Sequence, residues 1–314
     1  MKMTDVLGCV GGAAFLLLAS AWIPFIGPFF SLLTPLPFLC YATSLGLREG
    51  IKLSAVAVFA IGLLANLMGQ PQIVIFVIEF SIIGIGLSEL FRRELSLGRT
   101  LLLATVFMLL LGLGLLFFIG LSKNMGPIEM ILAYMAEHLN ATIGVYRDMN
   151  VEGTGTDVKA LETYAKAFML IISRIYPSLM IIGTGFALWL NIVIAKPLFK
   201  VWHLKYPPFA PMDRWQSPEY LVWGVIVSGF ALFLSSGSIE FLAINALIVI
   251  LAIYLFHGLS IVLFFLNKYK VPTWIRIGAY ILIMVQQLFF IVLILAGLFD
   301  QWADFRKIHR RADS

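Results

Sequence analysis

Long apolar runs separated by short polar or proline-containing connections are the dominant pattern of this chain. A helix of about 20 residues spans the roughly 30 Å hydrocarbon core of a bilayer, and several runs reach that length. The runs do not alternate apolar and polar residues, as the strands of a membrane barrel would. The pattern therefore predicts an all-α fold, a polytopic transmembrane helix bundle of about eight to nine spans. The nine candidate spans are 6–23, 29–47, 52–69, 72–91, 100–121, 167–195, 219–236, 240–266 and 275–298.

The connections carry residues that end helices or begin them. Gly27-Pro28 separates the first two spans, and Gly69-Gln70-Pro71 separates the third from the fourth. Before the seventh span, Ser217-Pro218 predicts a serine N-cap followed by proline in the first helical turn.

Lys and Arg are distributed unequally between alternate connections, which predicts the orientation of the chain. Cytoplasmic connections are enriched in these residues. The predicted cytoplasmic connections hold Arg48, Lys52, Arg92, Arg93, Arg99, Lys196, Lys200, Lys205, Arg214, Lys268, Lys270 and Arg276. The short turns near residues 24–28, 70 and 237–239 hold none, so the N-terminus is predicted to be cytoplasmic. Nine spans would then leave the basic tail outside, so the side of the C-terminus and the parity of the spans stay open.

The spans and connections divide the chain into four parts. Residues 1–195 form a six-helix membrane part, 196–218 an inner connection rich in proline, aromatic and basic residues, 219–299 a three-helix membrane part, and 300–314 a basic tail. The long outer connection 122–165 has apolar residues at helical spacing from Ile128 to Tyr146, typical of an amphipathic helix on the membrane face. Gly153–Thr156 is predicted to break it, and a second helix from about Asp157 is predicted to continue into the sixth span.

Composition agrees with this assignment and excludes several other classes. Apolar residues make up 61% of the chain and charged residues 12%, against about 25% charged in soluble domains. The net charge of +5 comes from the connections and does not indicate a nucleic-acid partner. Cys9 and Cys40 are predicted to be small buried hydrophobes rather than metal ligands or a disulfide. The N-terminus also imitates a signal peptide, but an uncleaved first span is the prediction, because further spans follow.

Three polar residues are expected in the outer half of the six-helix part. Glu79 lies eight residues from Pro71, about 12 Å below the outer edge at 1.5 Å per residue, and Asn66 is about 6 Å deep. Arg174 lies about 33 Å from the inner edge, near the outer interface. Ionisable groups in membrane spans are costly and usually face protein or water. These three residues therefore predict a small-molecule pocket beneath the long outer connection.

Two other interpretations of Glu79 remain open at this stage. The carboxylate pairs with Arg174 or a hydroxyl and holds helices together, or it stays protonated because apolar surroundings disfavour a charged carboxyl.

A second polar group is predicted near the midplane of the C-terminal part. His257 lies about 15 Å from the inner edge, and Gln286 and Gln287 are central in the last span. Hydrogen bonding between helices is the expected role, with a proton relay as the alternative.

Motifs of enzymes and cofactor sites are missing from the sequence. The four histidines form no HExxH motif, and no GxSxG elbow, Walker A loop or dinucleotide-binding glycine motif occurs. The sequence therefore predicts no enzyme, no catalytic residue, no cofactor and no metal site.

Five segments resemble one family of predicted bacterial membrane proteins, the YybS-like family. They are PFFSLLTPLPFLCYATSLGLREGIKLS, GFALWLNIVIAKPLFK, RWQSPEYLVWGVIVSGF, GLSIVLFFLNKYKVPTW and GLFDQWADFRK. Their order and spacing cover nearly the whole chain. The resemblance implies a multi-pass protein of the bacterial cytoplasmic membrane and names no substrate.

The first helix and the turn after it are more distantly similar to substrate-binding subunits of energy-coupling-factor vitamin transporters and to MreD-type membrane proteins. The similarity lies in VGGAAFLLLASA and in the following Pro35-Leu36-Pro37. In those subunits six helices hold a vitamin near the outer face, and small residues of the first helix contact the coupling subunit. The resemblance implies that contact role for Gly8, Gly12 and Ala13.

Two functions follow from these observations. The first is capture or transport of a small molecule through the pocket of Asn66, Glu79 and Arg174. The alternative is a non-catalytic membrane scaffold that organises a cell-envelope complex through residues 196–218 and 300–314. The expected partners are the lipid bilayer, a small-molecule ligand and a membrane protein.

Overall fold

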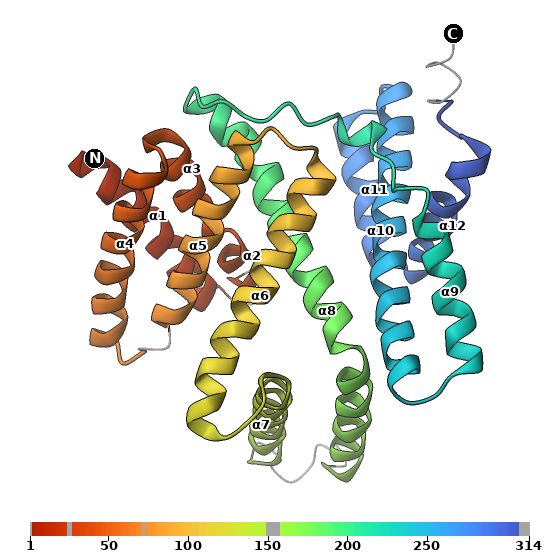
Figure 1. Ribbon diagram of the computed structural model, residues 1–314, viewed down its shortest axis with the longest axis horizontal. Helices are drawn as coiled ribbons and strands as arrows, with labels where there is room; N and C mark the ends of the chain where they lie inside the picture. Colours follow the sequence, from red (N-terminus) through yellow and green to blue (C-terminus); the bar gives the residue numbers. More distant parts are fainter. Residues whose placement is uncertain (1, 24–26, 71–72, 149–157, 308–314) are drawn as a thin grey trace. The chain divides into compact units, whose positions relative to one another are not determined.

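The structure is a computed structural model that describes residues 2–23, 27–70, 73–148 and 158–307. The described residues form helices and connections, with no strand among them. The helices are α1 (Met3–Trp22), α2 (Gly27–Leu32), α3 (Pro35–Leu45), α4 (Leu47–Leu67), α5 (Ile73–Arg92), α6 (Leu97–Lys123), α7 (Pro127–Asp148), α8 (Val158–Val201), a 3₁₀ turn at Met212–Arg214, α9 (Leu221–Leu234), α10 (Ser238–Lys268), α11 (Thr273–Val285) and α12 (Gln287–Ala303). The predicted all-α, polytopic fold is confirmed (Figure 1).

Each of the nine predicted spans falls on a helix or a helix pair, but they differ in length. Six described helices are long and apolar enough to cross a membrane, or seven if the bent pair α11 and α12 counts as one span. Two predicted spans correspond to shorter apolar helices, at Phe29–Leu45 and Leu221–Leu234. The last predicted span is not one continuous helix, because the chain bends by 102° between α11 and α12. Gln286 lies at this bend with extended backbone angles.

The chain divides into two compact units. Unit 1 comprises residues 1–123 and 183–209, and unit 2 comprises residues 124–182 and 210–314. The helix α8 is continuous through this division, and it begins at Val158, which confirms the predicted helix from about Asp157. The predicted amphipathic helix corresponds to α7, whereas the predicted break at 153–156 lies outside the described residues.

Unit 1 has a close-packed apolar core between α1, α3, α4 and α5. The side chains on α4 recur every four residues and so lie on one face of that helix. The core residues are Cys9, Ala13, Phe38, Leu53, Ala57, Ile61 and Val77. Cys9 and Cys40 are both buried and free, as the sequence predicts.

Two buried asparagines form hydrogen bonds with backbone groups at places where the helical hydrogen bonding is interrupted. The Asn191 amide donates to the carbonyl oxygen of Leu32, the last residue of α2, at 2.7 Å. In unit 2 the Asn245 side chain takes the place of a helical hydrogen bond beside Pro177. It accepts from the Ser178 N–H at 2.9 Å and donates to the Arg174 carbonyl at 2.8 Å. Polar backbone groups freed within apolar helices need such partners.

The helices α10 and α12 of unit 2 cross in close contact at two glycines. A Cβ atom at Gly258 would lie 2.1 Å from the Leu293 carbonyl oxygen, and one at Gly297 would lie 2.3 Å from the Tyr254 carbonyl oxygen. These distances are far below van der Waals contact. Only glycine therefore permits this approach, which is typical of small-residue interfaces between membrane helices.

We expect Gly297→Val to separate α10 from α12, because the added side chain meets the backbone of α10. Overpacking of this kind costs about 1–3 kcal/mol of unfolding free energy. The measurement is the thermal unfolding midpoint of the detergent-solubilised protein. Gly278→Val is the matched control, because a Cβ at Gly278 meets nothing within 4 Å. An equal change in both variants would contradict the packing described here.

Candidate functional site

A buried polar network joins α10, α12 and the connection before α9 in unit 2. His257 on α10 and Asp300 on α12 are both 0% exposed, and Arg306, just after α12, is 3% exposed. His257 Nδ1 lies 3.0 Å from the Ser217 hydroxyl, and Nε2 lies 3.1 Å from the Asp300 carboxylate. The predicted hydrogen bonding of His257 between helices is therefore confirmed.

Arg306 connects this network to the backbone of the connection. Its guanidinium donates to the Asp300 carboxylate at 2.9 Å and forms a buried ion pair with it. It also donates to the carbonyl oxygens of Asp213 and Trp215 and to the Ser260 hydroxyl, at 2.9–3.1 Å. A buried ion pair is stable only when such additional hydrogen bonds satisfy its remaining groups. Arg306 fulfils this condition through its bonds to Asp213, Trp215 and Ser260.

The Arg306 guanidinium also contacts the imidazole of His257. Its Nη2 lies 2.8 Å from His257 Nε2, and arginine is always a donor. With the imidazole proton on Nδ1, this nitrogen donates to Ser217 and Nε2 accepts from Arg306. With the proton on Nε2, this nitrogen donates to the Asp300 carboxylate at 3.1 Å, and Nδ1 accepts from the Ser217 backbone N–H at 3.5 Å. Each neutral tautomer therefore has partners in the network.

The connection reaches the network because it enters the bundle beside α10. Its Asp213 side chain accepts from Asn267 at 3.0 Å, near the end of α10, whereas Ser217 contacts His257, ten residues earlier. Ten residues correspond to about 15 Å of helix. The helix α9 therefore begins alongside the middle of α10 rather than level with its end. For this reason α9 is short. The predicted N-cap role of Ser217 is wrong, because Tyr220 is the residue at the N-cap of α9.

A cavity of about 280 Å³ borders this network. It is lined by Gln216, Ser217, Pro218, Glu219, His257 and Gln301. The Gln301 amide donates to the Ser217 hydroxyl at 3.3 Å and to the Tyr254 hydroxyl at 3.4 Å. A chain of hydrogen bonds therefore runs from Tyr254 through Gln301, Ser217 and His257 to Asp300 and Arg306. Ser217 and His257, in the middle of this chain, line the cavity.

The three residues of the predicted outer pocket are each described within their own unit. The Arg174 side chain lies 3.6 Å from the Glu240 carboxylate of α10, within unit 2. Asn66 is exposed and Glu79 is half-buried, and both belong to unit 1. None of the three lines the cavity at Ser217 or the cavity at Lys205 described below. A pocket formed by these residues stays a prediction.

The remaining predicted residues have identifiable positions. Gln286 and Gln287 are exposed at the bend between α11 and α12. A Cβ atom at Gly8 would lie 1.9 Å from the Tyr41 hydroxyl, and one at Gly12 would lie 3.3 Å from Pro37, so α3 occupies this face of α1. Ala13 is fully buried in the core of unit 1. The role of these three residues toward another subunit stays a prediction.

Sequence reasoning missed Asp300, Arg306 and Ser217 as site residues. Asp300 and Arg306 appear only in the segment GLFDQWADFRK, where they resemble ordinary charges at a helix end. The available signal was the position of Asp300 in an apolar run, since membrane carboxylates usually have a partner. Among the described residues, no three His, Cys, Asp or Glu side chains come together as a metal site.

We expect Asp300→Ala to lower the unfolding free energy by about 3–5 kcal/mol, because it leaves the Arg306 charge buried without its carboxylate. The double variant Asp300→Ala/Arg306→Met should recover part of this loss, because no unpaired charge remains. Thermal unfolding of the solubilised variants measures both, and Glu219→Ala, at an exposed carboxylate, is the control. Additive effects of the two substitutions would show that the charges are not coupled.

The comparisons with known proteins agree with a membrane protein along nearly the whole chain. The family model described as "Predicted membrane protein (DUF2232)" matches residues 13–301. The chain is 23% identical over 291 residues to a protein of Bacillus subtilis strain 168 named "Uncharacterized protein YybS", covering 91% of each chain. No solved structure matches it. The chain thus belongs to the DUF2232 family of predicted membrane proteins.

Proposed function

We propose that this membrane protein transports a small polar solute, and that the solute binds in the cavity beside Ser217, His257 and Gln301. The observation that carries the proposal is the buried network of ionisable side chains at that cavity. Ionisable groups within membrane spans are expensive, and they usually mark substrate or ion pathways. The proposal keeps the predicted function of substrate capture or transport and relocates the site to unit 2.

The broken helix pair supports this proposal. Transporters commonly form their sites with discontinuous helices, because irregular backbone at membrane depth is tolerated where it lines a cavity or is covered by protein. The 102° bend at Gln286 allows α12 to bring Asp300 against His257, and the short helix α9 leaves the connection within the bundle.

His257 supplies the element that would couple the solute to a proton. Its two ring nitrogens connect the Ser217 hydroxyl at the cavity to the Asp300–Arg306 pair. A solute that displaces Gln301 from Ser217 would change the partners of Nδ1, and the balance between the two imidazole tautomers would change with it. In this mechanism the imidazole accepts a proton on one side and donates one on the other.

The alternative, a non-catalytic scaffold that acts through residues 196–218 and 300–314, receives less support. Arg306 and Ser217 belong to these segments, but both are buried and bonded within the chain. The segments therefore use several of their polar groups internally. The described part of the tail ends at Lys307.

We expect the protein purified from its native membrane in mild detergent to retain a small polar molecule that depends on Gln301. Gln301→Leu removes the amide at the cavity wall, and the retained amount should fall about tenfold, as the loss of one or two good hydrogen bonds allows. Mass spectrometry of the released small molecules measures this. Gln287→Leu, an exposed glutamine at the bend, is the control. Identical content in all three proteins, or none in the wild type, would contradict the proposal.

A further inference from the structure

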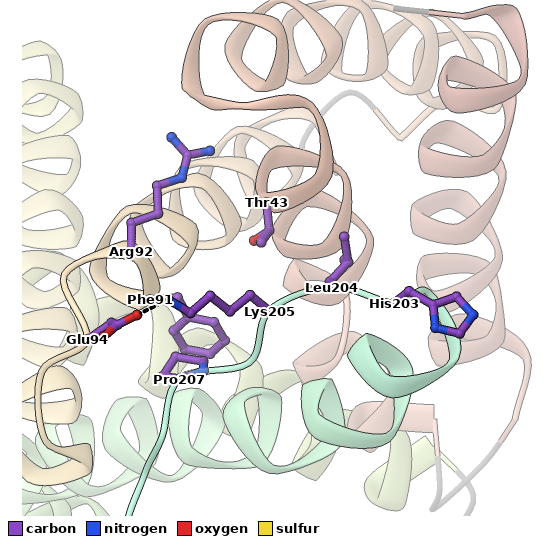
Figure 2. A pocket seen from close by; sticks show the side chains of 8 residues that line it. All are labelled: Thr43, Phe91, Arg92, Glu94, His203, Leu204, Lys205 and Pro207. Atoms are coloured by element: carbon purple, nitrogen blue, oxygen red, sulfur yellow. Dashed lines mark hydrogen bonds and ion pairs between the residues drawn. The ribbon is translucent and has the colours of Figure 1, made fainter.

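A second cavity, of about 330 Å³, lies in unit 1 where α5 ends and α8 gives way to the following connection. Its lining residues are Thr43, Phe91, Arg92, Glu94, His203, Leu204, Lys205 and Pro207 (Figure 2). They come from α3, from the end of α5 and from the segment after α8. The proposed transport mechanism does not use any of these residues.

One lining residue of this cavity, Phe91, is held by three other aromatic rings. The Phe91 ring contacts the rings of Phe199, Tyr206 and Phe209 edge to face, at centroid distances of 5.7–5.8 Å. The Tyr206 hydroxyl donates to the Ile192 carbonyl at 2.9 Å. Burial raises the pKa of Tyr206 to about 12, so this donor is retained at any physiological pH. The segment that carries Lys205 is therefore fixed against the end of α5.

Two permanent cations, from different segments, are among the residues that line this cavity. Arg92 donates to the Ala42 carbonyl at 3.0 Å, and its other terminal nitrogen lies 3.8 Å from Glu89. Lys205 forms an ion pair with Glu94, with the Lys side chain 82% and the Glu side chain 45% exposed. Figure 2 shows Lys205 extending toward Glu94, whereas Arg92, which bonds to Ala42, and His203 extend away from this pair. An exposed ion pair contributes only about 0–1 kcal/mol, so Lys205 can exchange its carboxylate for a stronger acceptor.

The surroundings of the cavity identify the type of acceptor. It opens among the Lys- and Arg-rich connections, and Trp202 packs edge to face on Tyr41 nearby, at a centroid distance of 5.1 Å. Tryptophan and tyrosine favour the headgroup level of a membrane. Basic pockets between helices at this level suit the phosphate of an anionic lipid headgroup. Phe91, Leu204 and Pro207 supply apolar surface for the glycerol and first methylene groups.

We propose that this cavity is a binding site for a phosphate group, with Arg92 and Lys205 as its cations and an anionic lipid headgroup as its ligand. Glu94 competes with the phosphate for Lys205. The site is independent of the solute cavity in unit 2.

Opposite effects of two substitutions test this proposal. The probe is dihexanoyl-phosphatidylglycerol, added to the protein in neutral detergent, and native mass spectrometry or calorimetry gives the Kd. Arg92→Gln/Lys205→Gln should weaken binding about tenfold or more, since two charge-assisted hydrogen bonds are lost. Glu94→Gln should strengthen it, because Lys205 no longer has a competing carboxylate. A merely structural ion pair predicts no gain from Glu94→Gln.

Two controls are needed. One distinguishes binding at this cavity from attraction to surface charge, and the other distinguishes a lipid ligand from free phosphate. Arg93→Gln/Lys200→Gln removes two exposed cations that do not line the cavity, and binding should stay within about twofold of wild type because surface charges contribute little. Binding of phosphatidylglycerol alone supports a lipid headgroup, and equal competition by inorganic phosphate supports a phosphate site open to soluble ligands. Equal weakening by both double variants, or no binding by wild type, would overturn the proposal.

Discussion

The buried ion pair between Asp300 and Arg306 is the interaction on which the arrangement of unit 2 depends. Two opposite charges without exposed surface are stable only if further hydrogen bonds replace the lost water. His257, Ser260 and the carbonyl oxygens of Asp213 and Trp215 supply these bonds. Because Arg306 needs those carbonyls, the connection has to enter the bundle. Because Asp300 needs His257, α12 has to pack on α10, and Gly258 and Gly297 make that approach possible.

These contacts also concern a question that the sequence leaves open, namely on which side of the membrane α12 ends. The end of α12 and the connection before α9 meet through Arg306, so they lie at the same end of unit 2. A pair of helices that bends by 102° and returns to the same side adds no crossing. Arg306 and Lys307, the last described basic residues, would then share a side with the Lys- and Arg-rich connections of unit 2, as charge distribution favours. The conflict in the span count disappears if the last predicted span is a re-entrant pair.

Sequence patterning was sufficient for the fold class and for most helices, because apolar runs of membrane length admit few other structures. It was also sufficient to identify His257 as a residue with partners on other helices. It did not predict the bend at Gln286, where neither proline nor glycine interrupts the run. If the last span were straight, Asp300 would lie at the end of that span that is far from His257. The sequence therefore gives no reason to place the two residues in one network. Asn191 and Asn245 were missed for a similar reason, since they bond to backbone groups 67 to 159 residues away.

The expected outer pocket rests on depth arguments and stays a prediction. Asn66, Glu79 and Arg174 have compatible depths, but depth along a helix does not determine which face a side chain occupies. Arg174 forms an ion pair with Glu240 on α10, which is 66 residues later in the chain. Both cavities lie beside connections, where the chain leaves regular helix and backbone and side-chain groups create irregular surfaces.

Access to the cavity beside Ser217 from both sides of the membrane tests the transport account most directly. Gln301→Cys, in a background in which Cys9 and Cys40 are alanine, can be labelled with a membrane-impermeant thiol reagent in vesicles of each orientation. Alternating access predicts labelling from both sides, with the rate from one side changing as the pH gradient across the membrane is reversed. Labelling from one side only, unaffected by the gradient, would contradict transport and leave the network as a structural lock between α10 and α12.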